Sequence, residues 1–311
     1  MGEAEHTFGG DWTERKLDAL LYYLQFYTVA LKGKTGAKWR FDLWYIDAFA
    51  GTGERTAERE TGGLFVSAPI GREQVQLDGS AKRALAIQPP FKRVVLIEAD
   101  AGRFEALCRL QEDPRVLCLR GDANEQLPVI FGGDSWRMPE RGKGLQRAVV
   151  FLDPYGMQVA WSTLELLAKT RRVDVWYLFP IEAVGRQLAH DLSAVDQWKQ
   201  ARLDAVLGGP EWRTELYEEE IIENDLFFQG GSRKKRKVGR IEIESYFQKK
   251  LRELFPFVSE ALPLGAGNQQ KFSLFLLVAN DSDAAINLAK SGVADMLKKQ
   301  RLAASRRRSD L

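Results

Sequence analysis

The sequence predicts an α/β fold in which a mostly parallel sheet is covered by helices on both faces. Short, continuously apolar segments alternate along the chain with segments of helical spacing. The apolar segments lack the period-two alternation of strands that face water on one side, and this continuity is typical of parallel strands. Ligands of such open sheets bind where the strands end, so the residues after each predicted strand are the candidate functional residues.

Each element follows from its own pattern of apolar residues. Residues 12–31 have helical spacing, with Thr13 as the expected N-cap. Residues 54–78 are Gly-rich and polar, and they predict a long loop. The predicted strands cover residues 43–46, 94–97, 116–119, 148–152, 175–179 and 271–280. The other predicted helices cover residues 80–87, 101–110, 162–167 (capped by Ser162), 241–255 and 284–298.

Three regions are expected along the chain. Residues 1–183 form an N-terminal helix and a Rossmann-like, cofactor-binding core, and residues 241–311 supply helices and strands that complete the sheet. Residues 184–240 interrupt the rhythm with a Gly-Gly-Pro break, an acidic run at Glu218–Glu220 and a basic run at Arg233–Lys237. We expect these residues to form an inserted helical subdomain whose basic loop faces water.

The composition indicates a soluble protein with a sizeable core. The 311 residues are 45 % hydrophobic and 28 % charged, with a formal net charge of +2. This near-neutral total makes no strong case for nucleic acid by itself, although positive charge is concentrated in the basic run and in Arg306–Arg308. No apolar run reaches the roughly 18 residues that span a bilayer, and the N-terminus lacks the apolar core of a signal peptide. We expect a cytoplasmic protein that does not contact membranes.

Metal and triad chemistry are disfavoured by the residue types present. Cys108 and Cys118 are the only cysteines and lack metal-ligand spacing, which fits a reducing cytoplasm and argues against a disulfide scaffold. His6 and His190 are the only histidines, and neither supports a zinc site or a Ser-His-Asp triad. We therefore expect no metal.

The most informative segment follows the first predicted strand and runs from Asp47 through Phe49 and Gly51 to Gly53. A turn of small residues lets the backbone approach a bound nucleoside closely. A dinucleotide fingerprint requires a third small residue where Thr56 stands, and an acid before the turn repels a diphosphate. S-adenosylmethionine (SAM) carries an ammonium and a sulfonium instead, so this segment favours SAM over an NAD-type cofactor. An ordinary strand-to-helix turn is the alternative.

Two further strand ends carry acids that suit the rest of the cofactor. Glu98 ends the second strand, where a carboxylate can accept both ribose hydroxyls. Asp122, followed by Ala123, comes after the third strand and can accept from the exocyclic amine of adenine. Each acid has a purely structural alternative, which is to cap the helix that follows.

The fourth strand ends in Asp153-Pro154-Tyr155-Gly156. An amine attacks a methyl group with its lone pair, and a carboxylate together with a backbone carbonyl can accept its hydrogens and orient that lone pair. The proline directs the carbonyl and removes a competing donor, and Tyr155 offers a face for base stacking. Methyl transfer then depends chiefly on positioning. A tight Asp-Pro turn is the alternative interpretation.

Taken in this order, the motifs resemble class I SAM-dependent methyltransferases, and the Asp-Pro-Tyr-Gly form resembles that of tRNA guanine-N2 dimethyltransferases. A closer resemblance is to the three-Cys-motif partner protein family (TcmP). It is carried by the segments 12–16, 45–53, 79–85, 151–157, 176–180 and 271–275. It covers nearly the whole chain except residues 215–240. The resemblance implies a class I methyltransferase fold, a SAM cofactor and a partner that carries three cysteines in a radical-SAM-like arrangement.

Two hypotheses of different classes follow. The first is a SAM-dependent N-methyltransferase that acts on a nucleobase nitrogen of RNA or DNA, with Lys16 on the first helix closing over the pocket. The second is a SAM-binding, non-catalytic partner of another protein or a nucleic acid, which would use the basic residues Arg233, Lys234 and Lys235. A third and weaker alternative is an NAD-type oxidoreductase, which Thr56 and Asp47 disfavour.

Overall fold

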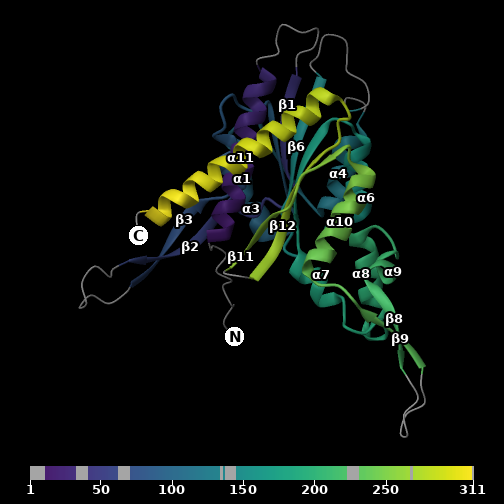
Figure 1. The fold of residues 1–311 in the computed structure, drawn as a ribbon. Helices are drawn as coiled ribbons and strands as arrows, with labels where there is room; N and C mark the ends of the chain where they lie inside the picture. Colours follow the sequence, from purple (N-terminus) through teal and green to yellow (C-terminus); the bar gives the residue numbers. More distant parts are fainter. Residues whose placement is uncertain are drawn as a thin grey trace. The chain divides into compact units, whose positions relative to one another are not determined.

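The computed structural model describes residues 11–32, 41–61, 71–133, 136, 145–222, 231–266 and 269–309. The chain divides into two compact units. Unit 1 comprises residues 1–126, 134–151 and 288–311, and unit 2 comprises residues 127–133 and 152–287. Figure 1 labels the helices and strands of both units.

Unit 1 alternates strands and helices as the sequence predicts. Its strands are β1 (Phe41–Asp47), β2 (Glu54–Thr61), β3 (Gly71–Asp78), β4 (Arg93–Glu98), β5 (Val116–Arg120) and β6 (Leu145–Leu152). Its helices are α1 (Asp11–Lys32), α2 (Ser80–Leu85), α3 (Ala101–Leu107), the 3-10 helix η1 (Cys108–Glu112), the start of α4 (Ala123–Gly132) and most of α11 (Asp283–Ser309). The strands predicted at 43–46, 94–97, 116–119 and 148–152 are confirmed.

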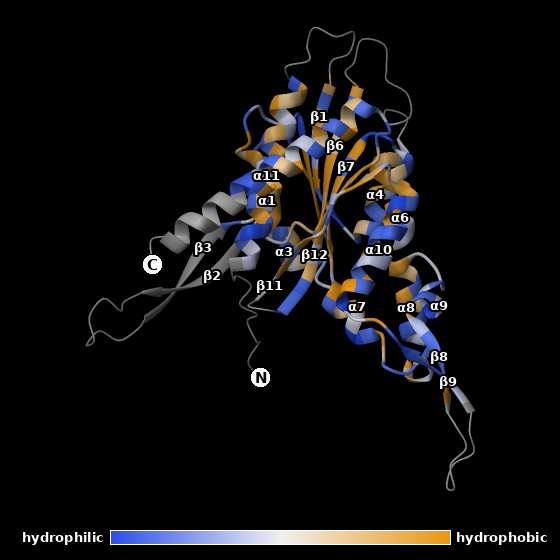
Figure 2. Ribbon diagram, viewed as in Figure 1, coloured by the Kyte–Doolittle hydropathy of each residue, from blue (hydrophilic) through white to orange (hydrophobic). Residues whose placement is uncertain are grey.

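The sheet of unit 1 is parallel, with the strand order β6-β1-β4-β5. Asp47 at the end of β1 pairs in register with Phe151 on one side and Leu96 on the other, so the carboxyl ends of these strands share one edge. Tyr45 and Ile46 are neighbours that point to opposite faces, yet both are fully buried. Both faces of the sheet are therefore covered, which confirms the predicted α/β class; Figure 2 shows the hydrophobic colouring of β1 and β6.

Residues 54–61 and 71–78 do not form the loop that the sequence predicts for residues 54–78; they are the antiparallel strands β2 and β3, which pair from Glu54 opposite Asp78 to Thr61 opposite Gly71. The rest of the predicted loop, residues 62–70, lies outside the described residues. Cross-strand hydrogen bonds satisfy the backbone groups of these polar strands. A strand that forms in this way needs no apolar run, so the sequence pattern does not reveal it. Two predicted N-caps are also wrong, because Thr13 lies inside α1 and Ser162 lies inside helix α6 (Trp161–Lys169).

Helices α1 and the unit 1 part of α11 pack against each other. Gly292 allows close approach, since a Cβ at this position would lie 2.9 Å from the ring of Phe26. The Tyr22 hydroxyl donates to Asp295 at 3.2 Å, and the Lys299 ammonium lies 4.5 Å from the centre of the Tyr22 ring. The last predicted helix is thereby joined to the first within unit 1.

Unit 2 combines helices with antiparallel strands. Its helices are α6 (Trp161–Lys169), α7 (Ile181–Gln187), the 3-10 helix η2 (Leu192–Ala194), α8 (Gln197–Leu207), α9 (Trp212–Glu215) and α10 (Arg240–Leu254). Its strands are β7 (Val173–Phe179), β8 (Tyr217–Ile222), β9 (Gly231–Arg236), β10 (Phe257–Val258), β11 (Leu262–Ala266) and β12 (Gln269–Val278). Strand β12 runs antiparallel to β7, β10 and β11. Phe247 of α10 stacks on Phe179 of β7 with ring centres 3.9 Å apart, which joins helix and sheet.

The basic run expected in a loop is instead strand β9, which pairs with the acidic strand β8. Glu220 accepts from Arg233 at 2.6 Å and from Lys235 at 3.2 Å. Arg236 donates to the carbonyls of Gly185 and Leu188, which anchors the hairpin on α7. Opposite charges on facing strands stabilise this register, and the sequence shows the two runs without showing that they pair. The inserted subdomain at 184–240 stays a prediction.

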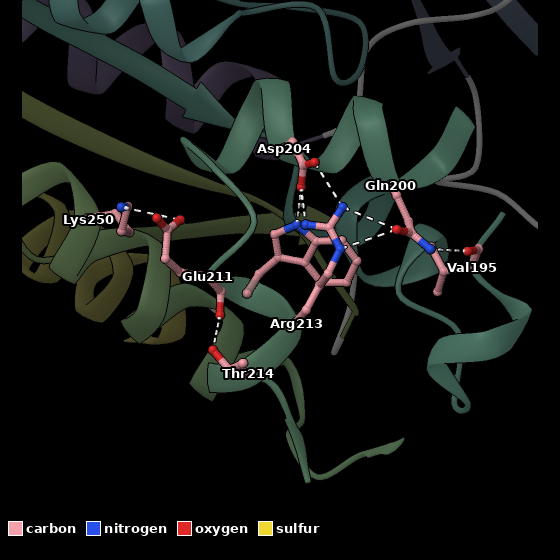
Figure 3. Close-up of polar contacts among 8 residues, drawn as sticks. Val195, Gln200, Asp204, Glu211, Arg213, Thr214 and Lys250 are labelled. Atoms are coloured by element: carbon pink, nitrogen blue, oxygen red, sulfur yellow. Dashed lines mark hydrogen bonds and ion pairs between the residues drawn. The ribbon is translucent and has the colours of Figure 1, made fainter. Parts of the chain in front are cut away.

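A charged network joins α8 to α9 (Figure 3). Asp204 accepts two hydrogen bonds from the Arg213 guanidinium, at 2.7 and 2.8 Å, and one from the Trp212 indole at 2.7 Å. Gln200 accepts from the same guanidinium. Partial burial raises the pKa of Asp204, but the hydrogen bonds from Arg213 and Trp212 outweigh it and leave the pKa below its ordinary value of 3.8.

This network predicts a pH dependence of stability. A carboxyl group whose pKa is lowered in the folded state contributes stability above its unfolded pKa and loses it as the pH falls through the folded pKa. We expect Asp204→Asn to lower the free energy of unfolding by about 1 kcal/mol at neutral pH, and the difference from the wild type to vanish well below pH 3.8. Urea unfolding across this pH range measures both, and Arg213→Gln should show the same pH profile. A difference that is constant with pH would contradict the assignment.

Candidate functional site

The chain turns sharply after β1, and this turn is held by both neighbouring strands. The Ala48 amide donates to the Phe151 carbonyl at 3.0 Å, and the Ala50 amide donates to the Ile97 carbonyl at 2.9 Å. The Gly53 amide closes the turn on the Ala50 carbonyl at 3.2 Å. The turn therefore lies at the carboxyl edge of the unit 1 sheet, where ligands of parallel sheets bind.

Glycine is needed at the two positions of this turn for different structural reasons. Both are left-handed, with φ of +62° at Gly51 and +77° at Gly53. A Cβ on Gly53 would lie 2.8 Å from a methyl carbon of Leu110, so this glycine is required for packing. A Cβ on Gly51 would meet no atom within 4 Å. Gly51 thus leaves open space beside the backbone, as a bound nucleoside requires.

Asp47 is fully buried at the start of the turn and is well supplied with donors. Its Oδ1 accepts from the Phe49 amide at 3.2 Å, and its Oδ2 accepts from the Ser80 hydroxyl at 2.6 Å and from the Tyr45 hydroxyl at 3.2 Å. Hydrogen bonds of this kind compensate the cost of burying a carboxylate. The sequence identified Asp47 and Phe49 but not Ser80 or Tyr45, because the spacing of residues does not show their pairing with Asp47.

Glu98 joins the second strand end to the turn. It is 4 % exposed, and its Oε2 accepts from the Gly51 amide at 3.0 Å. Its Oε1 accepts from the Asp100 amide at 2.8 Å and from Arg103 at 3.0 Å, which makes a salt bridge. Glu98 thus ends β4 as predicted and lies beside the glycine turn, and its role toward the ribose stays a prediction. No pattern in the sequence indicated Arg103, which lies five residues further on in α3.

The chain leaves the glycine turn as a strand and returns as a helix. β2 begins at Glu54, and after β3 the Gly79 amide donates to the Gly53 carbonyl at 3.1 Å. A Cβ on Gly79 would lie 2.8 Å from that carbonyl oxygen, so the return needs glycine. Ser80 then starts α2 and bonds to Asp47. The first helix residue beside the turn is thus already engaged with a carboxylate.

Asp122 follows β5 and caps α4. Its carboxylate Oδ1 accepts from the Asn124 amide at 2.7 Å and from the Asn124 side chain at 2.8 Å. This is the capping alternative considered for this residue. The Gly121 amide donates to the Glu98 carbonyl at 3.0 Å, so the end of β5 adjoins the end of β4, and the buried Ala123 begins α4. A role for Asp122 and Ala123 beside adenine stays a prediction.

Lys16 lies on α1 next to the end of β6. It is 6 % exposed, and its ammonium is 5.9 Å from the centre of the Phe151 ring and 5.5 Å from that of Trp12. Because Phe151 pairs in register with Asp47, Lys16 lies near the same edge of the sheet. The helical placement of Lys16 is as predicted, and its closure over a ligand stays a prediction.

In unit 2, the Asp153-Pro154-Tyr155 segment forms a short turn directly after β6. The Tyr155 amide donates to the Gln158 side chain at 2.8 Å, and the Gln158 amide donates to the Gly156 carbonyl at 2.9 Å. Pro154 is buried, whereas the Tyr155 side chain is 55 % exposed. Gln158 is a residue that the sequence did not indicate.

The remaining predicted residues lie on β9 in unit 2. Arg233 and Lys235 are ion-paired with Glu220, and Lys234 faces Glu219 in the register. Within the described ranges no group of three or more His, Cys, Asp or Glu side chains is arranged to hold a metal ion. No helix among the described residues is long and apolar enough to cross a membrane.

Comparisons with known proteins leave the family open. No family model matches the chain, and no curated protein matches it, so the resemblance to the TcmP family stays a hypothesis. A SAM-dependent methyltransferase from Clostridium acetobutylicum is 11 % identical, with 83 % of this chain and 90 % of that chain covered and a TM-score of 0.30. A putative SAM-dependent methyltransferase from Listeria monocytogenes is 9 % identical, with coverages of 84 % and 96 % and a TM-score of 0.34. LPL1258 from Legionella pneumophila, of the DUF519 family, is 14 % identical, with coverages of 70 % and 83 % and a TM-score of 0.34.

The left-handed backbone of Gly51 predicts that replacing it by alanine destabilises the protein, whereas the same replacement at a helical glycine stabilises it. Gly51→Ala should lower the free energy of unfolding by about 1–2 kcal/mol, because a Cβ strains a left-handed backbone even where space is open. The matched control is Gly185 in helix α7, where a Cβ would likewise meet no atom within 4 Å. Gly185→Ala should raise the free energy of unfolding by about 0.5–1 kcal/mol. Denaturant unfolding measures both, and an unchanged stability in Gly51→Ala would contradict the strained turn.

Proposed function

We propose that this protein binds SAM at the carboxyl edge of the unit 1 sheet and transfers its methyl group to a nucleobase nitrogen in RNA or DNA. The observation that carries the proposal is the pairing of two buried carboxylates, Asp47 and Glu98, with a left-handed glycine turn that has open space at Gly51. Both acids end adjacent parallel strands, where a ligand of this fold binds.

The charge of this edge favours SAM over a dinucleotide. A diphosphate binds where a glycine turn leads straight into the N-terminus of a helix. Here the turn leads into β2 instead, and the start of α2 is bonded to the Asp47 carboxylate through Ser80. Negative charge repels a diphosphate, whereas it attracts the ammonium and sulfonium of SAM.

In this proposal, Glu98, Asp47 and Lys16 of unit 1 each contact or cover a different part of the cofactor. One Glu98 carboxylate oxygen accepts a hydrogen bond from the Gly51 amide. A carboxylate can accept several hydrogen bonds, and Glu98 accepts further ones from the ribose hydroxyls. Asp47, held by Ser80 and Tyr45, supplies negative charge for the methionine ammonium. SAM supplies an electrophilic methyl group, and Lys16 covers the edge beside Phe151.

Asp153 is proposed as the residue that orients the substrate amine. Asp153 follows Phe151 by two residues, and a chain of that length spans at most about 7 Å. The backbone of Asp153 therefore lies within about 7 Å of Phe151, the residue of β6 that pairs with Asp47. Its carboxylate and the carbonyl before or at Pro154 accept the amine hydrogens, which directs the lone pair at the methyl group. Tyr155, with its exposed ring, stacks on the base.

The non-catalytic alternative places the function on the basic strand and a partner protein. The cross-strand pairs of Arg233 and Lys235 with Glu220 offset much of that positive charge, so this strand supports binding to nucleic acid less well than an unpaired basic loop would. A three-Cys-motif, radical-SAM-like partner remains a proposal that rests on the resemblance alone.

Titration calorimetry tests the cofactor. SAM should bind and NAD should not, and Glu98→Gln should weaken SAM binding by about 10–100-fold, since a charge-assisted hydrogen bond contributes about 1.5–3 kcal/mol. The matched control is Glu105→Gln on the exposed surface of α3, which should bind SAM like the wild type. Tight NAD binding without heat from SAM would overturn the proposal.

Transfer of labelled methyl groups tests the reaction. With total RNA and total DNA as alternative acceptors, the wild type should label one of them, and Asp153→Ala should abolish labelling while SAM binding persists. Asp281→Ala is the control, because Asp281 is exposed and pairs only at the surface with Arg171. Wild-type turnover in Asp153→Ala would show that Asp153 does not orient the substrate.

A further inference from the structure

The two cysteines lie on adjoining elements of unit 1. Cys118 lies on β5 and is 6 % exposed, whereas Cys108 begins η1 and is partly exposed. The Cys118 thiol donates to the carbonyl of Leu107, the residue before Cys108, at a sulfur–oxygen distance of 3.7 Å. The segment that leads into η1 thus lies against the buried sulfur.

The environment makes the two thiols unequal. Burial, the neighbouring Cys108 charge and a hydrogen bond with Cys108 raise the pKa of the Cys118 thiol to about 11. The bond of the Cys118 thiol to the Leu107 carbonyl places Cys118 against the start of η1, the helix that Cys108 begins. Because Cys108 is the more accessible of the two, it is the thiol that meets a reagent from solution.

The same segment supports the glycine turn. Methyl carbons of Leu110 and Leu107 lie 2.8 and 3.4 Å from the position of a Cβ on Gly53. The helix before it, α3, carries Arg103, which pairs with Glu98. A covalent bond between η1 and β5 would therefore fix the segment that packs under the turn.

We propose that Cys108 and Cys118 are a modification site, at which a reversible intramolecular disulfide joins η1 to β5. This inference goes beyond the proposed function and does not rest on it. The co-reactant is a small-molecule disulfide such as oxidised glutathione. The Cys108 thiolate attacks one glutathione sulfur and releases the first reduced glutathione, which leaves a mixed disulfide on Cys108.

The second exchange closes the bond within the chain. Cys118 loses its proton to solvent and attacks the Cys108 sulfur, which expels the second glutathione as a thiolate that takes up a proton. The protein dithiol is oxidised, one glutathione disulfide is reduced to two thiols, and no other reagent is consumed. Because the Cys118 thiolate is scarce at neutral pH, this second step should speed up about tenfold for each pH unit in the neutral range.

The experiment treats the full chain with oxidised glutathione and follows it by intact mass and by alkylation of free thiols. The sequence holds two cysteines, so the thiol count reports this pair alone. We expect both thiols to disappear together, with a mass lower by two hydrogens, a cross-linked peptide that contains Cys108 and Cys118, and full reversal by dithiothreitol. Amide hydrogen exchange of residues 108–112 should slow several-fold in the oxidised form.

Single variants complete the test. Cys118→Ser should stop at the glutathione adduct on Cys108, and Cys108→Ser should react far more slowly than the wild type; circular dichroism establishes that both remain folded. A wild-type adduct that persists on Cys108 beside a free Cys118 thiol would overturn the proposal. A disulfide found only between two chains, as a dimer on a non-reducing gel, would overturn it as well.

Discussion

The site in unit 1 depends on the Glu98 carboxylate, which joins three segments of chain. Glu98 is 4 % exposed, and its two oxygens accept from the amides of Gly51 and Asp100 and from the Arg103 guanidinium. A buried carboxylate without donors costs several kcal/mol or titrates to its neutral form. The glycine turn, the end of β4 and the start of α3 must therefore take up their positions together.

The hairpin β2–β3 is accommodated without disturbing this arrangement. The chain leaves at Gly53 and returns at Gly79, whose amide bonds to the Gly53 carbonyl, so the ends of the insertion touch. An insertion with adjoining ends changes the entropy of loop closure only slowly with its length. Ser80 can then reach Asp47 as if no residues had been inserted.

The strands β1, β4 and β6 of unit 1 could be predicted because each contains a continuous apolar run that is largely buried on both faces. The errors concern segments whose structure comes from pairing with another polar segment. The β2–β3 hairpin was expected to be a loop, and so was β9, which pairs with the acidic β8. Asp122 had two interpretations, and its bond to the Asn124 amide corresponds to the cap. Propensity and periodicity describe one segment at a time, so they do not reveal which partner a polar strand finds.

The sequence by itself determined the α/β class, the positions of the apolar strands along the chain and the acids at their ends, because apolar periodicity and turn residues act over a few neighbouring positions. Only the tertiary structure decided what those acids bond to. Glu98 and Gly51 are 47 residues apart, and Ser80 meets Asp47 only after the hairpin has returned. The same holds for Cys108 and Cys118, whose spacing suggested no relationship until η1 packed over β5. Contacts between distant segments depend on how the whole chain packs, and local sequence patterns do not predict that packing.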